Sequence, residues 1–232
     1  MALQEVALAS RDGDLVDNAG DLARQLGMEV RYGATRTYRI TDERGSVAGA
    51  GCFGNALLSR LPIGTSRAIM LPMAPPDAFV EPPGTHHPAA GLRYADAPEG
   101  IHEPRTLLLA EIAGMTVAST HLSHVGSGER MLQAAATTAA LAANRPALVL
   151  GDLNAPIEAP ELAAFSAWGD GFAAAGIPPG DERRVSTDDG FRIDHVLARG
   201  VSVEGCRVLR DAGDLSDHYP VVAEVAKPVG SR

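Results

Sequence analysis

The stretch from residue 106 to residue 150 constrains the fold of this chain more than any other. Thr106 to Ile112 is an apolar run of strand length, Ala113-Gly114 supplies a tight turn, and Met115 to Thr120 forms a second run. Glu129 to Ala143 is rich in alanine and leucine and contains no glycine or proline, which predicts a helix packed on a sheet. Ala147 to Leu150 predicts a buried strand. A hairpin, a helix and a buried strand in this order indicate a mixed α/β fold with antiparallel pairs.

Other periodic segments add helices and strands to both sides of this stretch. Leu15 to Leu26 carries apolar residues at helical spacing and stops at Gly27, which predicts a helix with a left-handed residue at its end. The further predicted elements are a helix at Glu161–Trp168 and strands at Met28–Tyr32, Ala56–Ser59, Ile193–Ala198, Val201–Leu209 and Val221–Val225.

Residues 71–102 differ in kind from the rest of the chain. They contain seven prolines and show no sustained periodicity, so they predict a long irregular loop. Such a loop could cover a site and select its substrate.

Length and charge limit the classes of function. The chain has 232 residues, which we interpret as a single domain spanning 1–232. A net charge of −9 disfavours broad, charge-driven binding to a nucleic acid backbone, although a local basic cleft is compatible with it. Cys52 and Cys206 match no metal-ligand spacing. Neither a signal peptide nor a transmembrane segment is visible, so we predict a cytoplasmic protein and expect a monomer.

Two polar motifs follow or precede predicted strands. Gly151-Asp152-Leu153-Asn154 comes directly after a buried strand, where Asp152 could deprotonate a water and Asn154 could bind a phosphate oxygen. Ser216-Asp217-His218 precedes the last strand and places a hard oxygen ligand beside an imidazole. Each motif taken alone is equally compatible with a turn.

Three further segments carry groups of the same kind. Asp194 begins a predicted strand and could orient a catalytic imidazole. His121 closes one strand of the predicted hairpin and Glu103 precedes the other, so the two could meet at one end of the sheet. Glu5 offers a second carboxylate for a metal, although a glutamate near a chain end is more often only solvated.

Taken together and in order, these motifs resemble those of the endonuclease/exonuclease/phosphatase (DNase I-like) family. The segments that carry the resemblance are Gln4-Glu5, Gly54–Arg60, Glu103–Arg105, Thr120–Leu122, Gly151–Asn154, Ile193–His195 and Ser216–His218. The resemblance implies a four-layered α/β sandwich, with two mixed β-sheets between helices and a catalytic cleft at one edge of the sheets. The family's usual first strand, which carries an Asn, has no counterpart here, and His195 stands where the family usually has Tyr.

The resemblance also implies a divalent-metal-dependent hydrolase of phosphoester bonds, that is, a phosphodiesterase, nuclease or phosphatase. Glu5 and Asp217 would hold Mg²⁺ or Mn²⁺. The catalytic set would be Asp152, Asn154, His121, His218, Asp194 and Glu103, with Glu103 behind His121 and Asp194 orienting His218. Asn55 and Arg105 would contact the substrate.

Two alternatives stay open at the level of sequence. The first is a catalytically impaired family member that acts as a binding module because the first-strand Asn is missing. The second is a zinc hydrolase that uses His86, His87, His121 and His124. The substrate could be a small molecule, a lipid head group or a nucleic acid, because one fold serves many phosphoesters.

Overall fold

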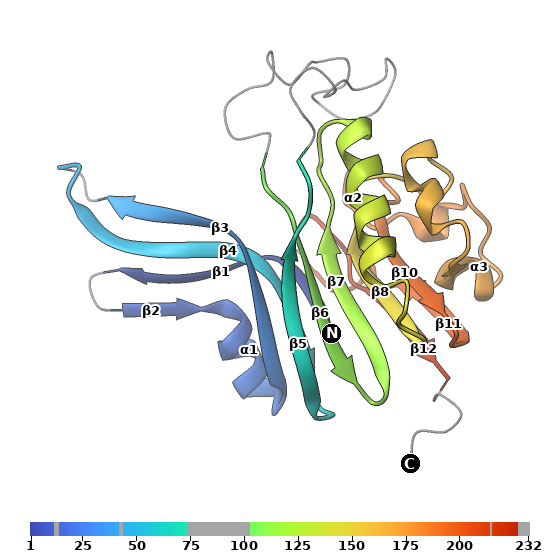
Figure 1. Cartoon of the computed structure of the whole chain (residues 1–232), viewed down its shortest axis with the longest axis horizontal. Helices are drawn as coiled ribbons and strands as arrows, with labels where there is room; N and C mark the ends of the chain where they lie inside the picture. Colours follow the sequence, from blue (N-terminus) through green and yellow to red (C-terminus); the bar gives the residue numbers. More distant parts are fainter. Residues whose placement is uncertain (12–13, 42–43, 74–102, 214, 227–232) are drawn as a thin grey trace.

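Two β-sheets packed face to face form the framework of the protein in the computed structural model, which describes residues 1–11, 14–41, 44–73, 103–213 and 215–226 (Figure 1). The first sheet has the order β2-β1-β4-β3, with strands Asp14–Asp17, Ala2–Arg11, Val47–Ser59 and Glu29–Thr41. The second sheet has the order β5-β6-β7-β8-β10-β9, with strands Ile63–Met70, Thr106–Ile112, Met115–His121, Ala147–Asp152, Asp194–Arg199 and Gly169–Asp170. Strands β11 (Val203–Val208) and β12 (Val221–Val225) form a separate antiparallel pair.

Helices cover the outer faces of the two sheets and complete four layers. Helix α1 (Asn18–Leu26) packs on β4 of the first sheet, and α2 (Ser127–Ala140) with the 3₁₀ helix η3 (Pro160–Phe165) packs on the second sheet (Figure 1). The short helix α3 (Gly171–Ala174) and the 3₁₀ turn η4 (Glu182–Arg184) lie near β11. The four-layered α/β sandwich predicted from the sequence is therefore confirmed.

The side chains of the second sheet alternate between its two faces, so the sheet contributes to two hydrophobic cores, one on each face. In β6, Leu107 and Leu109 face the helices while Leu108 and Ala110 face the other sheet, and all four are buried. Because successive side chains of a strand point to opposite faces, an unbroken apolar run is what a sheet covered on both sides requires.

The predicted helix at Leu15–Leu26 begins three residues too early. Leu15 and Val16 belong to β2, and the Asp17 side chain caps the helix by accepting a hydrogen bond from the Gly20 N–H. A capping Asp marks the first residue of a helix more accurately than the spacing of apolar residues does. The predicted end is confirmed, because Gly27 is left-handed with φ of 64°.

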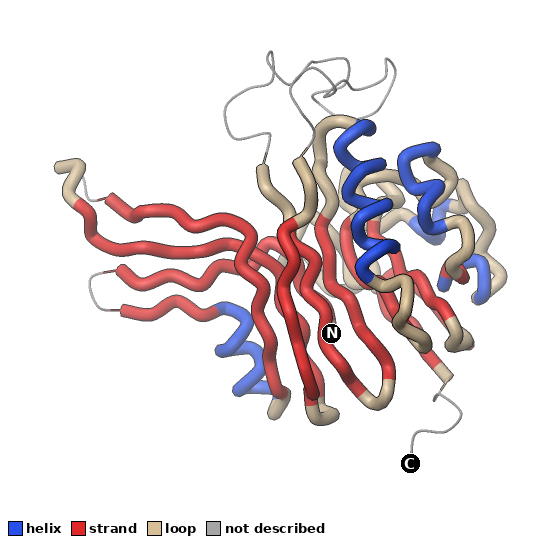
Figure 2. Tube along the Cα trace, viewed as in Figure 1, coloured by secondary structure: helices blue, strands red, loops and turns tan. Residues whose placement is uncertain are grey.

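The predicted strands at Met28–Tyr32 and Ala56–Ser59 are only the inner ends of much longer strands. β3 continues to Thr41 and β4 starts at Val47, and Figure 2 shows both projecting well beyond the second sheet. The outer halves are rich in glycine, alanine and polar residues, so they lack the apolar pattern that marks a strand. Polar residues likewise interrupt the apolar residues of β1 and β5, which were not predicted, and β2 was predicted as the start of the helix.

The other predicted elements differ from the structure in their ends or in helix type. Helix α2 begins at Ser127 and ends at Ala140, and the predicted helix at Glu161–Trp168 is the 3₁₀ helix η3. Residues 71–73 are irregular as predicted, and the remainder of the Pro-rich segment, residues 74–102, lies outside the described residues.

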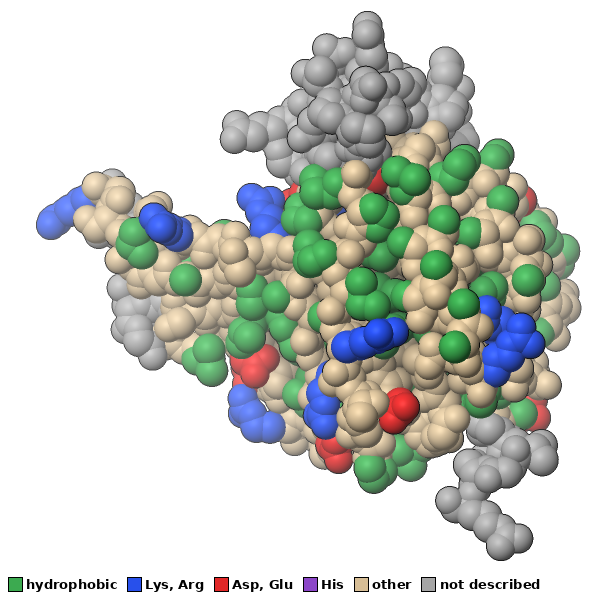
Figure 3. All heavy atoms as spheres, viewed as in Figure 1, with side chains coloured by type: hydrophobic (Ala, Val, Ile, Leu, Met, Phe, Trp, Pro, Cys, Tyr) green, Lys and Arg blue, Asp and Glu red, His purple; other side chains and the backbone are tan. Residues whose placement is uncertain are grey.

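Among the described residues, no helix is long and apolar enough to cross a membrane. On the face drawn in Figure 3, apolar and charged side chains are interspersed, and the Lys and Arg side chains do not merge into one field.

The close approach of β7 and β8 yields a test of the fold. A Cβ at Gly151 would lie 1.9 Å from the carbonyl oxygen of Thr120, and the φ of Gly151 is +152°. We therefore expect Gly151→Ala to lower the free energy of unfolding by about 3 kcal/mol or more, measured by urea denaturation. Gly169→Ala is the control, because its added Cβ meets a single atom at an ordinary 3.5 Å. Equal stability of the two variants would contradict the tight β7–β8 contact.

Candidate active site

Three strand ends converge at one edge of the second sheet. Strands β7 and β8 are parallel, and their register places His121 opposite Asp152. Strand β10 runs antiparallel to β8 and begins with Asp194 opposite Asp152. Neighbours in register on adjacent strands share a face of the sheet, so these three side chains are brought together by backbone pairing alone.

Residues 186–188 hold His218 beside these strands. Thr187 forms an antiparallel bridge with His218, the Tyr219 N–H donates to the Ser186 carbonyl at 2.7 Å, and the Asp188 N–H donates to the Asp217 carbonyl at 3.0 Å. The Ser186 hydroxyl also accepts a hydrogen bond from the Asp194 N–H at 3.2 Å. Residues 186–188 thus connect the Ser-Asp-His motif to the start of β10. Isolated bridges of this kind leave no periodic signal in a sequence.

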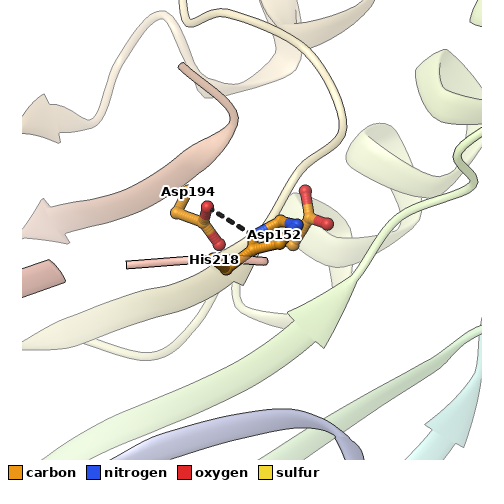
Figure 4. Close-up of side chains that lie close together, drawn as sticks. All are labelled: Asp152, Asp194 and His218. Atoms are coloured by element: carbon orange, nitrogen blue, oxygen red, sulfur yellow. Dashed lines mark hydrogen bonds and ion pairs between the residues drawn. The ribbon is translucent and has the colours of Figure 1, made fainter. Parts of the chain in front are cut away.

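His218, Asp194 and Asp152 form the centre of the site (Figure 4). His218 Nδ1 lies 2.8 Å from Asp194 Oδ2, and in Figure 4 the ring lies between the two carboxylates. The hydrogen bond to Asp194 raises the pKa of His218 to about 9, with the charges of Asp194 and Asp152 adding to it. Burial and the nearby Asp194 carboxylate raise the pKa of Asp152 to about 8. The predicted pairing of Asp194 with His218 is therefore present in the structure.

Asn154 joins Asp152 to His121. Its N–H donates to Asp152 Oδ1 at 2.7 Å, and its side-chain Nδ2 lies 2.9 Å from His121 Nε2 and 3.0 Å from the Leu122 carbonyl. Asn154 has φ of 52°, in the left-handed region that asparagine tolerates better than most residues. Burial lowers the pKa of His121 well below its ordinary value, and the charge of Arg105 lowers it further. His121 is therefore neutral at neutral pH, and its Nε2 lies 3.3 Å from Asp152 Oδ2 without forming an ion pair.

Glu5 approaches the same group from the first sheet. It has φ of 57° and sits at an irregularity in the pairing of β1 with β4, between Leu3 and Val6. A β-bulge redirects a side chain that would otherwise follow the alternation of the strand. Glu5 Oε1 lies 3.6 Å from His121 Nδ1, so the structure brings Glu5 to the predicted site.

Three predicted residues take positions that differ from those expected. Glu103 Oε1 accepts a hydrogen bond from Arg36 Nη1 at 2.7 Å and lies near Arg105, so its link to His121 runs through Arg105. Arg105 is buried, with its guanidinium 3.2 Å from His121 Nδ1 and 2.9 Å from His124 Nδ1. Asn55 is buried and donates to the Thr106 carbonyl at 2.7 Å, which places it in the packing between the sheets. Sequence spacing could not distinguish these buried contacts from contacts to a substrate.

Two other histidines have clear positions. His195 is buried, and its Nε2 donates to the Ala155 carbonyl at 2.9 Å. His124 lines the cavity, and its Nδ1 lies 2.9 Å from Arg105 Nη2. His86 and His87 lie outside the described residues.

The candidate site lies in one cavity of about 1030 Å³. Glu5, Asp152, Asn154, Asp194, Asp217 and His218 form its polar part, together with Glu103, Arg105, His121 and His124. Apolar side chains from the two sheets and from β12 also line it, including Leu57, Val117, Leu148 and Val225.

The donor set of the cavity fits a divalent cation. Asp152, Asp194 and His218 each offer one ligand atom, and these atoms lie within 4.8 Å of one another. Glu5 and Asp217 line the same cavity, outside this closest group, and add carboxylates from two other segments. Carboxylate oxygens are the ligands that Mg²⁺ and Mn²⁺ prefer.

The Asp194–His218 pair yields a test by pH. In protein stripped of metal with EDTA, we expect the pKa of His218 to be about 9 and to fall toward the ordinary value of about 6.5 in Asp194→Asn, measured by NMR titration. Because the folded pKa is raised, the contribution to stability is fully present below about 6.5 and is lost as the pH rises through about 9. An unchanged pKa in the variant would show that Asp194 is not the partner.

A model of the Endonuclease/Exonuclease/phosphatase family matches residues 1–218. No curated protein sequence matches the chain at a significant level.

Solved structures share its fold at low sequence identity. The endonuclease/exonuclease/phosphatase of Beutenbergia cavernae superposes with a TM-score of 0.67 at 22% identity, covering 98% of this chain and 62% of that protein. The human Nocturnin catalytic domain with bound sulfate has a TM-score of 0.57 at 15% identity, covering 97% and 79%. The 3′ phosphatase NExo of Neisseria, bound to a product DNA hairpin, has a TM-score of 0.54 at 16% identity, covering 90% and 83%. The chain thus spans less than two thirds of the Beutenbergia protein.

Proposed function

We propose, from the premise that this chain belongs to the endonuclease/exonuclease/phosphatase family, that it is a divalent-metal-dependent hydrolase of phosphoester bonds. The observation that carries the proposal is the convergence of Asp152, Asp194 and His218 within 4.8 Å at the end of paired strands. Two carboxylates lie beside an imidazole whose pKa is raised, and all three side chains line a large cavity. Such an arrangement is typical of a site that stabilises charge.

In the proposed mechanism, Glu5 and Asp217, which both line the cavity, would hold Mg²⁺ or Mn²⁺. The ion, when bound, supplies positive charge against the charge that develops on the phosphoryl group, and its presence favours the ionised forms of nearby carboxylates. Ionised Asp152 orients the attacking water and accepts its proton. Asn154 and His121 donate hydrogen bonds to phosphoryl oxygens.

His218 has a different task in this mechanism because it is charged at neutral pH. Asp194 keeps the ring protonated and fixes its orientation through the 2.8 Å hydrogen bond. Protonated His218 stabilises the charge of the transition state or donates a proton toward the leaving oxygen. A neutral His121 and a charged His218 thus act on the phosphoryl group in different protonation states.

Small or lipid-like phosphoesters suit this chain better than long nucleic acids as substrates. The net charge of −9 opposes a polyanion, and aromatic residues make up only 4% of the sequence, which leaves few platforms for base stacking. The DNA-bound NExo structure supports a nucleic acid terminus as the main rival. A panel of DNA, RNA, inositol phosphates and choline phospholipids, assayed with Mg²⁺ or Mn²⁺, decides between them.

Variants of the two central residues test the reaction. We expect Asp152→Ala and His218→Ala each to lower kcat for a generic aryl phosphodiester by on the order of 10²–10³ or more, because each removes a group that acts in the transition state. Far-UV circular dichroism and urea denaturation check that the variants stay folded. Glu204→Gln, at an exposed position on β11, is the control and should keep full activity. Activity retained in both central variants would refute the assignment.

Metal removal provides an independent test. We expect EDTA treatment to abolish hydrolysis and added Mg²⁺ or Mn²⁺ to restore it, since their preferred ligands are the carboxylates of the cavity. Rescue by Zn²⁺ alone would favour the histidine-based zinc site instead. Folded protein that binds metal but hydrolyses no substrate of the panel would favour the binding-module reading.

A further inference from the structure

His121 lies between two hydrogen-bond donors. Arg105 Nη1 is 3.2 Å from its Nδ1, and Asn154 Nδ2 is 2.9 Å from its Nε2. A neutral imidazole has one lone pair for accepting a hydrogen bond, because its other nitrogen carries the proton. Only one of the two donors can be satisfied by the ring, and the choice decides which nitrogen is protonated.

Arg105 is the stronger of the two donors. Its guanidinium is permanently charged, and a hydrogen bond from a charged donor is roughly twice as strong as a neutral one. It is also buried, with only 3% of its surface exposed, so water does not replace a lost partner. Asn154 has an alternative acceptor in the Leu122 carbonyl at 3.0 Å.

With Arg105 donating to Nδ1, the ring proton of His121 resides on Nε2, which lies 3.3 Å from Asp152 Oδ2. The same guanidinium donates through Nη2 to Nδ1 of His124 at 2.9 Å. The two terminal nitrogens of one planar guanidinium therefore each donate to the Nδ1 atom of a different imidazole. His121 and His124 both line the cavity.

We propose that Arg105 is a positioning residue that fixes His121 and His124 as Nε2–H tautomers, so that each ring offers an N–H donor on the side away from Arg105. The use of these donors on a phosphoryl oxygen rests on the proposed function, whereas the tautomers themselves do not. The opposite tautomer would turn a lone pair toward the anionic oxygens and repel them. Nδ1 of His121 faces the permanently charged guanidinium at 3.2 Å, so the lone pair stays on that nitrogen.

The tautomers can be measured without catalysis. In metal-free protein labelled with ¹⁵N-histidine, a long-range ¹H–¹⁵N correlation spectrum at neutral pH should show protonated Nε2 and unprotonated Nδ1 for both rings. Arg105→Met removes the donors and keeps an apolar stem, and we expect His121 to shift toward the Nδ1–H form because Asn154 becomes its only donor. Arg105→Lys keeps the charge but cannot bridge two rings, so one histidine should keep its tautomer. Arg67→Met, at an exposed position on β5, should change neither ring.

Kinetics then separate positioning from direct contact with substrate. We expect Arg105→Met to lower kcat for an aryl phosphodiester by roughly 10–100-fold with KM changed less than twofold, and Arg105→Lys to recover part of the loss. A main effect on KM with unchanged tautomers would show that Arg105 contacts the substrate, which overturns the proposal.

The wild-type spectrum decides the matter even if Arg105→Met does not fold. An Nδ1–H form of His121 or His124 in wild-type protein overturns the proposal. If the tautomers respond as expected but no phosphoester is hydrolysed, the proposed function fails and the role of Arg105 in setting the tautomers stands.

Discussion

The parallel pairing of β7 with β8 is the interaction on which the rest of the site depends. It sets His121 opposite Asp152, and the adjacent antiparallel pairing of β8 with β10 sets Asp194 opposite the same residue. The pairing is close enough that only a glycine fits at position 151. A shift of β8 by one residue would turn Asp152 to the other face, so the register is also what decides whether these groups meet.

A buried polar network holds the segment that follows β7. Gln133 of α2 accepts from the Ser123 N–H at 2.7 Å and donates to Glu129, while Arg130 donates to the Ser123 and His124 carbonyls and pairs with Glu161. Buried charges and amides are costly unless they are partnered, and a network with named partners fixes one geometry for the loop. The backbone of His124 is thereby anchored from α2, while its ring is held by Arg105, which directly precedes β6.

The sequence predicted those helices and strands whose position is determined by one local pattern of residues. The apolar runs of β6, β7 and β12 were placed within one residue, and the left-handed end of α1 at Gly27 was placed correctly. The family resemblance also predicted that Asp194 orients His218, and the two side chains are hydrogen-bonded in the structure. Contacts that depend on side chains from distant segments were beyond reach: the sequence did not indicate that Arg105 lies beside two histidines or that Asn55 donates to the Thr106 carbonyl. The glycine- and alanine-rich outer halves of β3 and β4 carry no apolar pattern, because little of their surface is buried.

The charges of the site fit a function that requires a cation. Burial and the Asp194 carboxylate raise the pKa of Asp152, and Asp194 also raises the pKa of His218. Asp194 therefore opposes the ionisation of Asp152 and favours the protonated, cationic form of His218. Two carboxylates and an imidazole within 4.8 Å can be balanced by protons or by a divalent ion. A divalent ion, if bound, would supply positive charge that favours the ionised form of Asp152, and only that form can accept a proton from water. The strand register places Asp152 opposite Asp194, so it also sets the ionisation of Asp152 on which the proposed enzyme depends.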